Sequence, residues 1–147
     1  MDADVDVALS APTLLARAGE CRHNDMEAGV KYVVLIYNNP KVWEELPRSE
    51  QDRVLGIHNQ LIKELTESGE MLRVDGLAHP INTKTVRLRD GAPVITDGPF
   101  SEAKEQLAGV WALECDSIER AIEIAAPVAE YDVVEVRPLM DLSGTEM

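Results

Sequence analysis

His58 and Asp97 are the two residues of this sequence whose side chains could together move a proton. His58 comes four residues after Val54 and three before Leu61, so helical spacing places its imidazole on the apolar face of a predicted helix or at the border of that face. Imidazole gains and loses a proton near neutral pH and is a common general acid or base. If Asp97 approached the ring it would orient it, and the pair could then abstract a proton or expel a leaving group.

Each of these residues also has a purely structural interpretation. His58 could be a histidine at the edge of the core whose ring is satisfied by a backbone carbonyl. Asp97 could be a turn aspartate that accepts hydrogen bonds from the N–H groups of the residues after it. The sequence leaves both interpretations open.

Asp97 opens the segment Asp97-Gly98-Pro99-Phe100, which is the strongest local pattern in the chain. Gly98 tolerates backbone conformations that a Cβ would exclude and Pro99 fixes its own φ, so we expect a stiff turn that holds Asp97 and Phe100. Phe100, the only phenylalanine, is either a plug of the core or a surface for a ligand. The residues that we expect to contact a ligand lie at this turn or on the predicted strands around it: Tyr37, Gly98, Pro99, Phe100, Lys104 and Trp111.

The remaining candidate groups do not indicate a metal or a cofactor, and we expect neither. Cys21 and His23 form one Cys-x-His pair, whereas a structural zinc site needs four ligands at set spacings. Lys104, with acidic neighbours, is either a solvated charge or a contact for an anionic substrate. His79 looks incidental. The chain has no glycine loop that would cradle a phosphate and no nucleophile elbow.

The composition is that of an acidic globular protein with one domain. The chain has 147 residues, of which 45% are hydrophobic and 28% charged, and a domain of this length buries about two-thirds of its surface. The net charge of −13 repels phosphate backbones and anionic membranes, so we expect no nucleic-acid or membrane partner. Cys21 and Cys115 are expected to be free thiols in a reducing cytoplasm, and no apolar run is long enough to span a bilayer.

Two predicted helices are separated by predicted strands. Residues 31–37 are nearly all apolar and predict a central strand. Ser49 is a favourable N-cap and predicts the start of a helix that Gly69 ends, and Asp116 with Glu119 predicts the start of a second helix. The other predicted strands are 70–75, 85–89, 93–96, 107–115 and 132–137, and the pair 85–89 and 93–96 forms a hairpin.

Without the hairpin, the predicted order is β-α-β-β-α-β, the ferredoxin-like α+β arrangement of a four-stranded antiparallel sheet with two helices on one face. We assign residues 30–140 to this domain, 1–29 to a loosely ordered N-terminal extension and 141–147 to a tail. The other face of the sheet would expose apolar side chains, at a cost of roughly 25 cal/mol per Å². We therefore expect a homodimer that packs sheet on sheet into an α+β barrel. The alternative is a monomer in which the hairpin and residues 1–29 cover this face.

Four segments carry a pattern more specific than their individual elements. They are residues 31–37, the His58 helix, residues 85–91 and above all the run 96–109, Thr-Asp-Gly-Pro-Phe-Ser-Glu-Ala-Lys-Glu-Gln-Leu-Ala-Gly. Together they resemble the DGPF-domain branch of the YCII-related proteins, over about Lys31 to Pro138. The resemblance implies a dimeric ferredoxin-like α+β barrel. Relatives in the wider superfamily include lactone isomerases and a dehydrochlorinase, and other DGPF-type proteins are encoded beside extracytoplasmic-function sigma factors.

The resemblance also implies an acid–base pair. In YCII-related enzymes a histidine on the first helix is paired with an aspartate just before a proline near the end of the second helix. His58 fits the first position, but this chain has Ala125-Ala126-Pro127 at the second, so the pair is broken there.

Two hypotheses follow from these patterns. The first is a small-molecule enzyme or binding protein with a pocket between sheet and helices, in which His58 and Asp97 act. The second is a non-catalytic regulatory or accessory dimer associated with an extracytoplasmic-function sigma factor system. A cavity with His58 on its wall favours the first.

Overall fold

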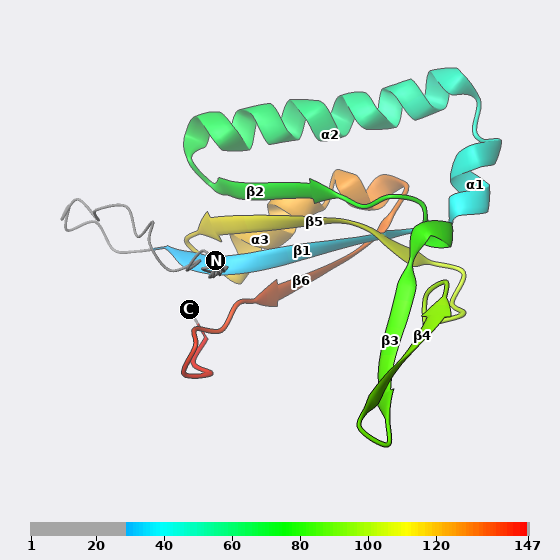
Figure 1. Ribbon diagram of the computed structural model, residues 1–147. Coiled ribbons are helices and arrows are strands. Elements are labelled where there is room, and N and C mark those ends of the chain that lie inside the picture. Colours follow the sequence, from blue (N-terminus) through cyan, green and yellow to red (C-terminus); the bar gives the residue numbers. More distant parts are fainter. Residues whose placement is uncertain (1–28, 147) are drawn as a thin grey trace, which may run out of the picture.

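The computed structural model describes residues 29–146 and has the ferredoxin-like architecture that the sequence predicts (Figure 1). The elements are β1 Val30–Asn38, α1 Pro40–Glu45, α2 Arg48–Ser68, β2 Met71–Gly76, η1 Pro80–Asn82, β3 Lys84–Arg89, β4 Ala92–Asp97, β5 Gln106–Cys115, α3 Ile118–Ala125, η2 Val128–Glu130 and β6 Val133–Pro138. Four antiparallel strands form the main sheet in the order β2-β5-β1-β6, and β3 and β4 form a separate two-stranded sheet. The predicted N-terminal extension and the Cys21-x-His23 pair lie outside the described residues.

One face of the main sheet carries the hydrophobic core. β1 is central, with β5 on one side and β6 on the other. Its alternate residues Tyr32, Val34 and Ile36 are buried, whereas Val33 and Leu35 are half-buried, because successive side chains of a strand point to opposite faces. Residues of α2 and α3 pack against the buried side chains of Tyr32, Val34 and Ile36. The core cluster is Tyr32, Val34, Ile36, Leu65, Trp111, Leu113, Cys115, Ala121, Ile124, Ala125 and Val128.

The starts of two helices differ from the prediction. α2 begins at Arg48 because the carbonyl of Pro47 accepts the first backbone hydrogen bonds, at 2.9 and 3.1 Å. The predicted N-cap Ser49 is therefore wrong and lies inside the helix. α3 is capped by Ser117, whose hydroxyl accepts the backbone N–H three residues ahead at 3.2 Å, and not by Asp116.

β3 and β4 form a hairpin that projects from the end of the main sheet, away from α2 (Figure 1). Asp90 and Gly91 at its tip have φ of 51° and 78°, the left-handed values that a tight two-residue turn requires. Apart from the half-buried Thr85, every residue of the two strands is exposed. Two hydrogen bonds of Gly98 hold the base of the hairpin together. The Gly98 N–H donates to the carbonyl of Thr83 at 2.8 Å, and the Thr85 hydroxyl donates to the carbonyl of Gly98 at 2.7 Å.

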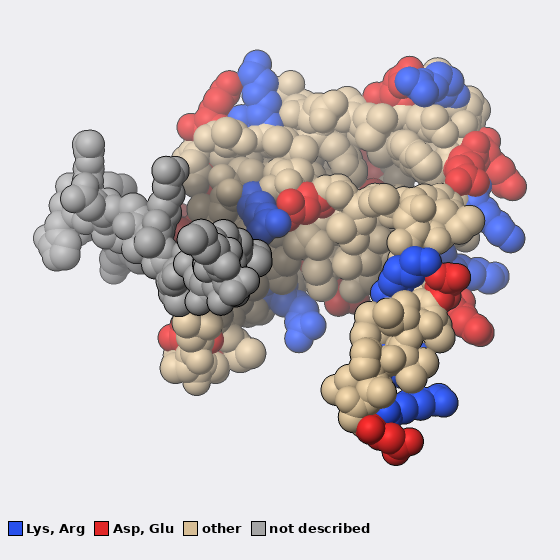
Figure 2. Space-filling model, viewed as in Figure 1, with Lys and Arg blue, Asp and Glu red and all other residues tan. Residues whose placement is uncertain are grey.

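The face of the main sheet opposite α2 and α3 has an apolar centre and charged margins. On the central strands, Val33 lies opposite Ala112 and Leu35 opposite Val110, and all four are half-buried. On the edge strands, the residues in register with these four are charged: Arg73 and Asp75 on β2, and Glu135 and Arg137 on β6. The hairpin surface turned toward the viewer in Figure 2 is also largely uncharged between its base and its tip.

A bidentate ion pair connects α3 with the turn between α2 and β2. The Arg120 guanidinium donates through Nε and Nη2 to the two carboxylate oxygens of Glu70, each at 2.9 Å. The side chain of Glu70 is 21% exposed, and the hydrogen bonds from Arg120 lower the pKa of Glu70 below its ordinary value. Because the folded pKa is depressed, the pair stabilises the fold at a pH above the pKa of the unfolded chain, and this stability is lost as the pH falls through the folded pKa.

We predict that Glu70→Gln lowers the free energy of unfolding by about 1 kcal/mol at pH 7, since it removes a charge-assisted pair that solvent partly screens. The difference from the parent should narrow as the pH falls below about 4, where the carboxyl becomes protonated. Urea unfolding at neutral and acidic pH measures both effects. Glu123→Gln is the control, because Glu123 meets the same guanidinium at 3.3 Å but is 68% exposed, and its effect should be smaller. If the loss in free energy of unfolding caused by Glu70→Gln does not change with pH, the charge of Glu70 does not contribute to stability as predicted.

Candidate functional site

His58 lies on the inner side of α2, over the covered face of the sheet. Val54, one helical turn before it, is 3% exposed, and Ile62, one turn after it, packs against the core cluster. The imidazole meets Trp111 of β5 edge to face, with 5.9 Å between ring centroids and 80° between ring planes. The His58 side chain is 20% exposed, so the ring lies at the border of the apolar layer, as the helical spacing predicts.

Asp132 approaches the same ring from the start of β6. It immediately precedes β6, in which Val134 and Val136 pack against the core cluster. Because side chains alternate along a strand, Asp132 shares their side of the sheet. Its Oδ2 lies 3.6 Å from Nε2 of His58, and its side chain is 7% exposed.

This arrangement leaves Nε2 of His58 without a hydrogen bond. The atom is buried and has no partner among the described residues, since 3.6 Å exceeds hydrogen-bond distance. A movement of about half an ångström would let Nε2–H donate to Asp132. A neutral imidazole has one donor and one acceptor nitrogen, so Nδ1 would then be free to accept a proton from a bound molecule.

His58 and Asp132 line a cavity of about 580 Å³, which we call the His58 cavity. Both tryptophans of the protein, Trp43 and Trp111, are on its wall, as are Asn38 and Asn59. Its other apolar wall residues include Ile36, Val54, Ile62, Val74, Leu77 and Leu107. A volume of this size with a few polar groups on an apolar wall is typical of sites for small organic molecules.

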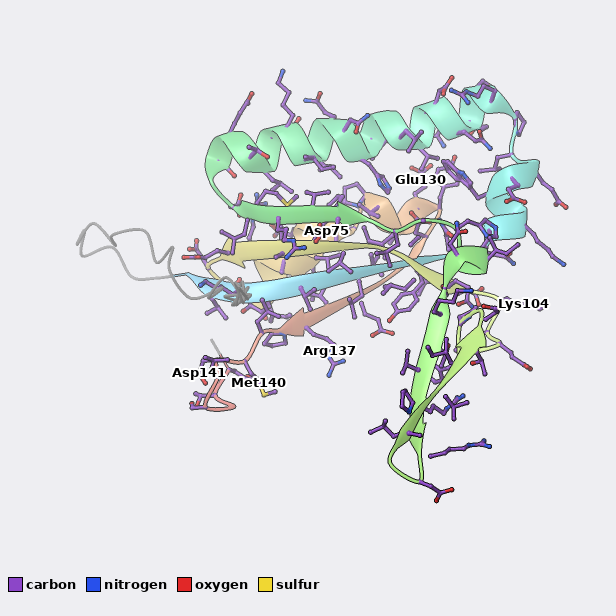
Figure 3. All side chains as sticks on the ribbon, viewed as in Figure 1. Asp75, Lys104, Glu130, Arg137, Met140 and Asp141 are labelled. Atoms are coloured by element: carbon purple, nitrogen blue, oxygen red, sulfur yellow. The ribbon has the colours of Figure 1, made fainter. Side chains whose placement is uncertain are left out.

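A second cavity, of about 780 Å³, lies where the hairpin joins the domain, and we call it the hairpin-base cavity. Three of the predicted ligand-binding residues, Tyr37, Pro99 and Phe100, line it. Phe100 is 77% exposed, so it is not a plug of the core. Gly98 and Lys104 line neither cavity; Figure 3 shows Lys104 in the loop before β5.

The structure does not bring Asp97 to His58. Asp97 lies at the end of β4, where it forms an ion pair with Lys84 across the hairpin, and its side chain is 84% exposed. It lines neither cavity, and β4 belongs to the projecting hairpin and not to the main sheet that faces His58. The carboxylate beside His58 is that of Asp132.

His79, which looks incidental in the sequence, lines both cavities. Its Nδ1 accepts the N–H of Ile81 at 3.1 Å, so Nε2 carries the proton when the ring is neutral. Nε2 lies 3.2 Å from the carboxylate of Glu44. This contact connects α1 with the segment after β2, at the point where the two cavities meet.

A group of polar side chains fixes the segment that carries Asp132. The Arg53 guanidinium contacts Glu50 at 3.3 Å and Glu130 at 3.2 Å, and it lies 5.0 Å from the centre of the Tyr131 ring. The Tyr131 hydroxyl donates to Glu50 at 3.1 Å. Glu130, which lies beneath α2 (Figure 3), and Tyr131 directly precede Asp132. These contacts hold the start of β6 against the first turns of α2, and the hydrogen bond to Glu50 raises the pKa of Arg53.

Metal ligands and reactive thiols do not gather at this site. Within residues 29–146, no three His, Cys, Asp or Glu side chains are grouped as a metal site requires. Cys115 is 5% exposed, and burial raises the pKa of its thiol, which keeps it protonated at neutral pH. The same part of the chain has no helix with the length and apolar character needed to cross a membrane.

Fold and site together define a ferredoxin-like α+β protein with a histidine–carboxylate pair in a cavity between its sheet and its helices. A family model described as the YCII-related domain matches residues 30–143, and the chain belongs to this family. It is also similar to the uncharacterized protein R00369 of Rhizobium meliloti (strain 1021), with 31% identity over 112 residues that cover 74% of this chain and 90% of that protein. The resemblance seen in the sequence is confirmed at the level of the YCII-related family.

Asp132 is the site residue that the sequence analysis missed. The resemblance implies an acid just before Pro127, whereas the carboxylate that lies beside His58 comes five residues after that proline, beyond η2. One pattern could have indicated it. Asp132 precedes a strand in which Val134 and Val136 occupy the buried positions, so alternation alone places its carboxylate on the helix side.

We predict that Arg53→Met accelerates amide hydrogen exchange at Glu130, Tyr131 and Asp132 several-fold, because it removes the contacts that hold this segment against α2. Arg48→Met is the matched control: Arg48 lies on the same helix, is 83% exposed and pairs only within the helix in the described contacts, with Asp52 at 3.1 Å. It should leave exchange at these amides unchanged. Equal exchange rates in the two variants would show that the Arg53 contacts do not hold this segment.

Proposed function

We propose that this YCII-related protein binds a small organic molecule in the His58 cavity and transfers a proton to or from it. His58 is the acid–base residue, and Asp132 is the carboxylate that orients its ring. The observation that carries the proposal is the unpartnered Nε2 of His58, 3.6 Å from Asp132 at the wall of the cavity. A buried polar atom without a partner costs about 1–3 kcal/mol, so an atom of this kind on a cavity wall is more typical of a functional site than of a core.

The groups around His58 suit proton transfer at a carbon next to a carbonyl group. With Nε2–H directed at Asp132, Nδ1 takes the proton from the C–H bond, and the electron pair of that bond moves toward the carbonyl oxygen. Asn38 and Asn59 carry amide donors on the same wall that suit this oxygen as it gains charge. The imidazolium then returns the proton to another carbon or to a leaving group, so the reaction is an isomerisation or an elimination.

Solvent deuterium exchange into a panel of small carbon acids, namely γ-lactones, cyclic ketones and β-keto esters, tests the proposal by NMR. His58→Ala is expected to lower the exchange rate about 100-fold or more, because it removes the base. Asp132→Asn is expected to lower it by about 10- to 100-fold, because the ring loses its orientation.

Asp97→Asn is the matched control, since this carboxylate is 84% exposed and lines neither cavity. It is expected to leave the exchange rate unchanged. If no compound exchanges faster with the parent than with His58→Ala, the catalytic proposal fails. That result would favour the alternative, a non-catalytic regulatory dimer associated with a sigma-factor system.

We also propose that the protein is a homodimer that packs through the uncovered face of the main sheet. The half-buried strip around Val33 and Leu35 supports this, because apolar surface in contact with water is unfavourable. The hairpin adds support: Val86, Leu88 and Ile95 are 61%, 73% and 64% exposed, and they lie on one of its faces by register. A two-stranded hairpin is marginally stable alone in water, so a second subunit would stabilise it.

Light scattering on the purified protein is expected to give twice the chain mass of 16.2 kDa. Leu35→Glu should shift the mass toward one chain, because it places a charge in the middle of the proposed contact. Ile122→Glu is the control, since Ile122 is 53% exposed on α3, whose buried residues face the other side of the sheet. A parent protein of 16.2 kDa in solution would exclude the dimer.

A further inference from the structure

The His58 cavity and the hairpin-base cavity are adjacent. The wall residues that they share are Leu77, Ala78, His79, Pro80 and Leu107. The first four form the segment after β2, and Leu107 on β5 lies in register with Tyr37 of β1. A molecule bound along these shared residues would therefore have His58 near one end and the hairpin base near the other.

The surface of the hairpin-base cavity is mainly apolar, although polar side chains such as Asn82 and Gln106 also line it. Phe100 is 77% exposed and Leu77 is 48% exposed, and Tyr37 and Pro99 also form its wall. Large apolar groups that surround a hollow and remain in contact with water mark a site that something apolar covers. Gly98 has a left-handed φ of 85°, and the turn that it forms places Phe100 on the wall of this cavity and not in the hydrophobic core.

The charged side chains of the same wall do not favour an anionic ligand. Lys84 is paired with Asp97, and His79 is paired with Glu44. Glu105 adds a carboxylate to the wall, and the net charge of −13 repels anions. These groups disfavour an anion, and the apolar wall favours a ligand without net charge over a cation, because burying a charge against apolar side chains is costly.

We propose that the two cavities form one binding site for an elongated, uncharged molecule. Its polar end lies beside His58 and Asp132, and its aromatic or alkyl end lies against Phe100. The proposal rests on the proposed function for the polar end, and it adds the chemical class and the length of the ligand. The cavities, of about 580 and 780 Å³, share five wall residues, so a ligand that fills both extends from His58 to the hairpin base.

Isothermal titration calorimetry with 4-alkylphenols, from 4-methylphenol to 4-pentylphenol, tests the proposal on the full chain. The phenol hydroxyl can bond to His58, and the alkyl chain can extend toward Phe100. We expect the affinity to rise about fourfold with each added methylene, because each one is removed from water. Phe100→Ala should abolish this rise while leaving the affinity for 4-methylphenol unchanged.

Ile81→Ala is the matched control, because Ile81 is also 77% exposed and lines neither cavity. It should leave the rise intact. His58→Ala should weaken binding of every phenol by the same factor and keep the rise, since the alkyl end is unaffected.

Several results would overturn the proposal. They are equal affinities along the series, a rise that survives Phe100→Ala, and binding of 4-pentylphenol that His58→Ala leaves unchanged. The last result would make the hairpin-base cavity a separate site. Failure of the proposed proton transfer can be distinguished from failure of this proposal. Proton transfer is measured by deuterium exchange into carbon acids that are too short to reach Phe100, whereas the extended site is measured by phenol binding.

Discussion

The site depends on the contact between His58 and Asp132, two polar side chains that lie beside the apolar core of the covered face. Between the sheet and its helices, residues such as Val34 and Leu113 are completely buried, while Asp132 is 7% and His58 20% exposed. Burying a carboxylate is costly unless a partner compensates it, and the fold places the imidazole of His58 3.6 Å from the Asp132 carboxylate. The two residues come from α2 and from the start of β6, so folding is what assembles the pair.

The two faces of the main sheet differ in what lies against them. The covered face holds the core and, at one end, the His58 cavity. The opposite face has an apolar centre with charged margins, and the hairpin beside it carries apolar side chains that no other element of the described chain buries. The hairpin-base cavity lies between these regions, since Tyr37 and Phe100 both line it. In the proposed dimer, the subunit contact and the proposed ligand would therefore lie close to one another at the hairpin base.

The predictable parts of this molecule are those set by short-range patterns. The apolar run of β1, the left-handed Gly69 after α2 and the Asp90-Gly91 turn each follow from a few neighbouring residues, and together they lead to the ferredoxin-like order. The predicted helix caps are wrong because the N-cap position is taken by Pro47, two residues before Ser49, and by Ser117, one residue after Asp116. The partner of His58 could not be chosen in this way. Asp97 has the more distinctive local sequence, but only the packing of β6 beside β1 brings a carboxylate, that of Asp132, to the ring.

The central claim is that the Asp132 carboxylate orients the imidazole of His58, and nitrogen-15 NMR of the two ring nitrogens tests it most directly. At a pH where the ring is neutral, we expect Nε2 to carry the proton more completely than it does in the unfolded chain, and Asp132→Asn to return the tautomer populations toward those of the unfolded chain. A ring whose two tautomers are populated as in the unfolded chain, with or without Asp132, would contradict it.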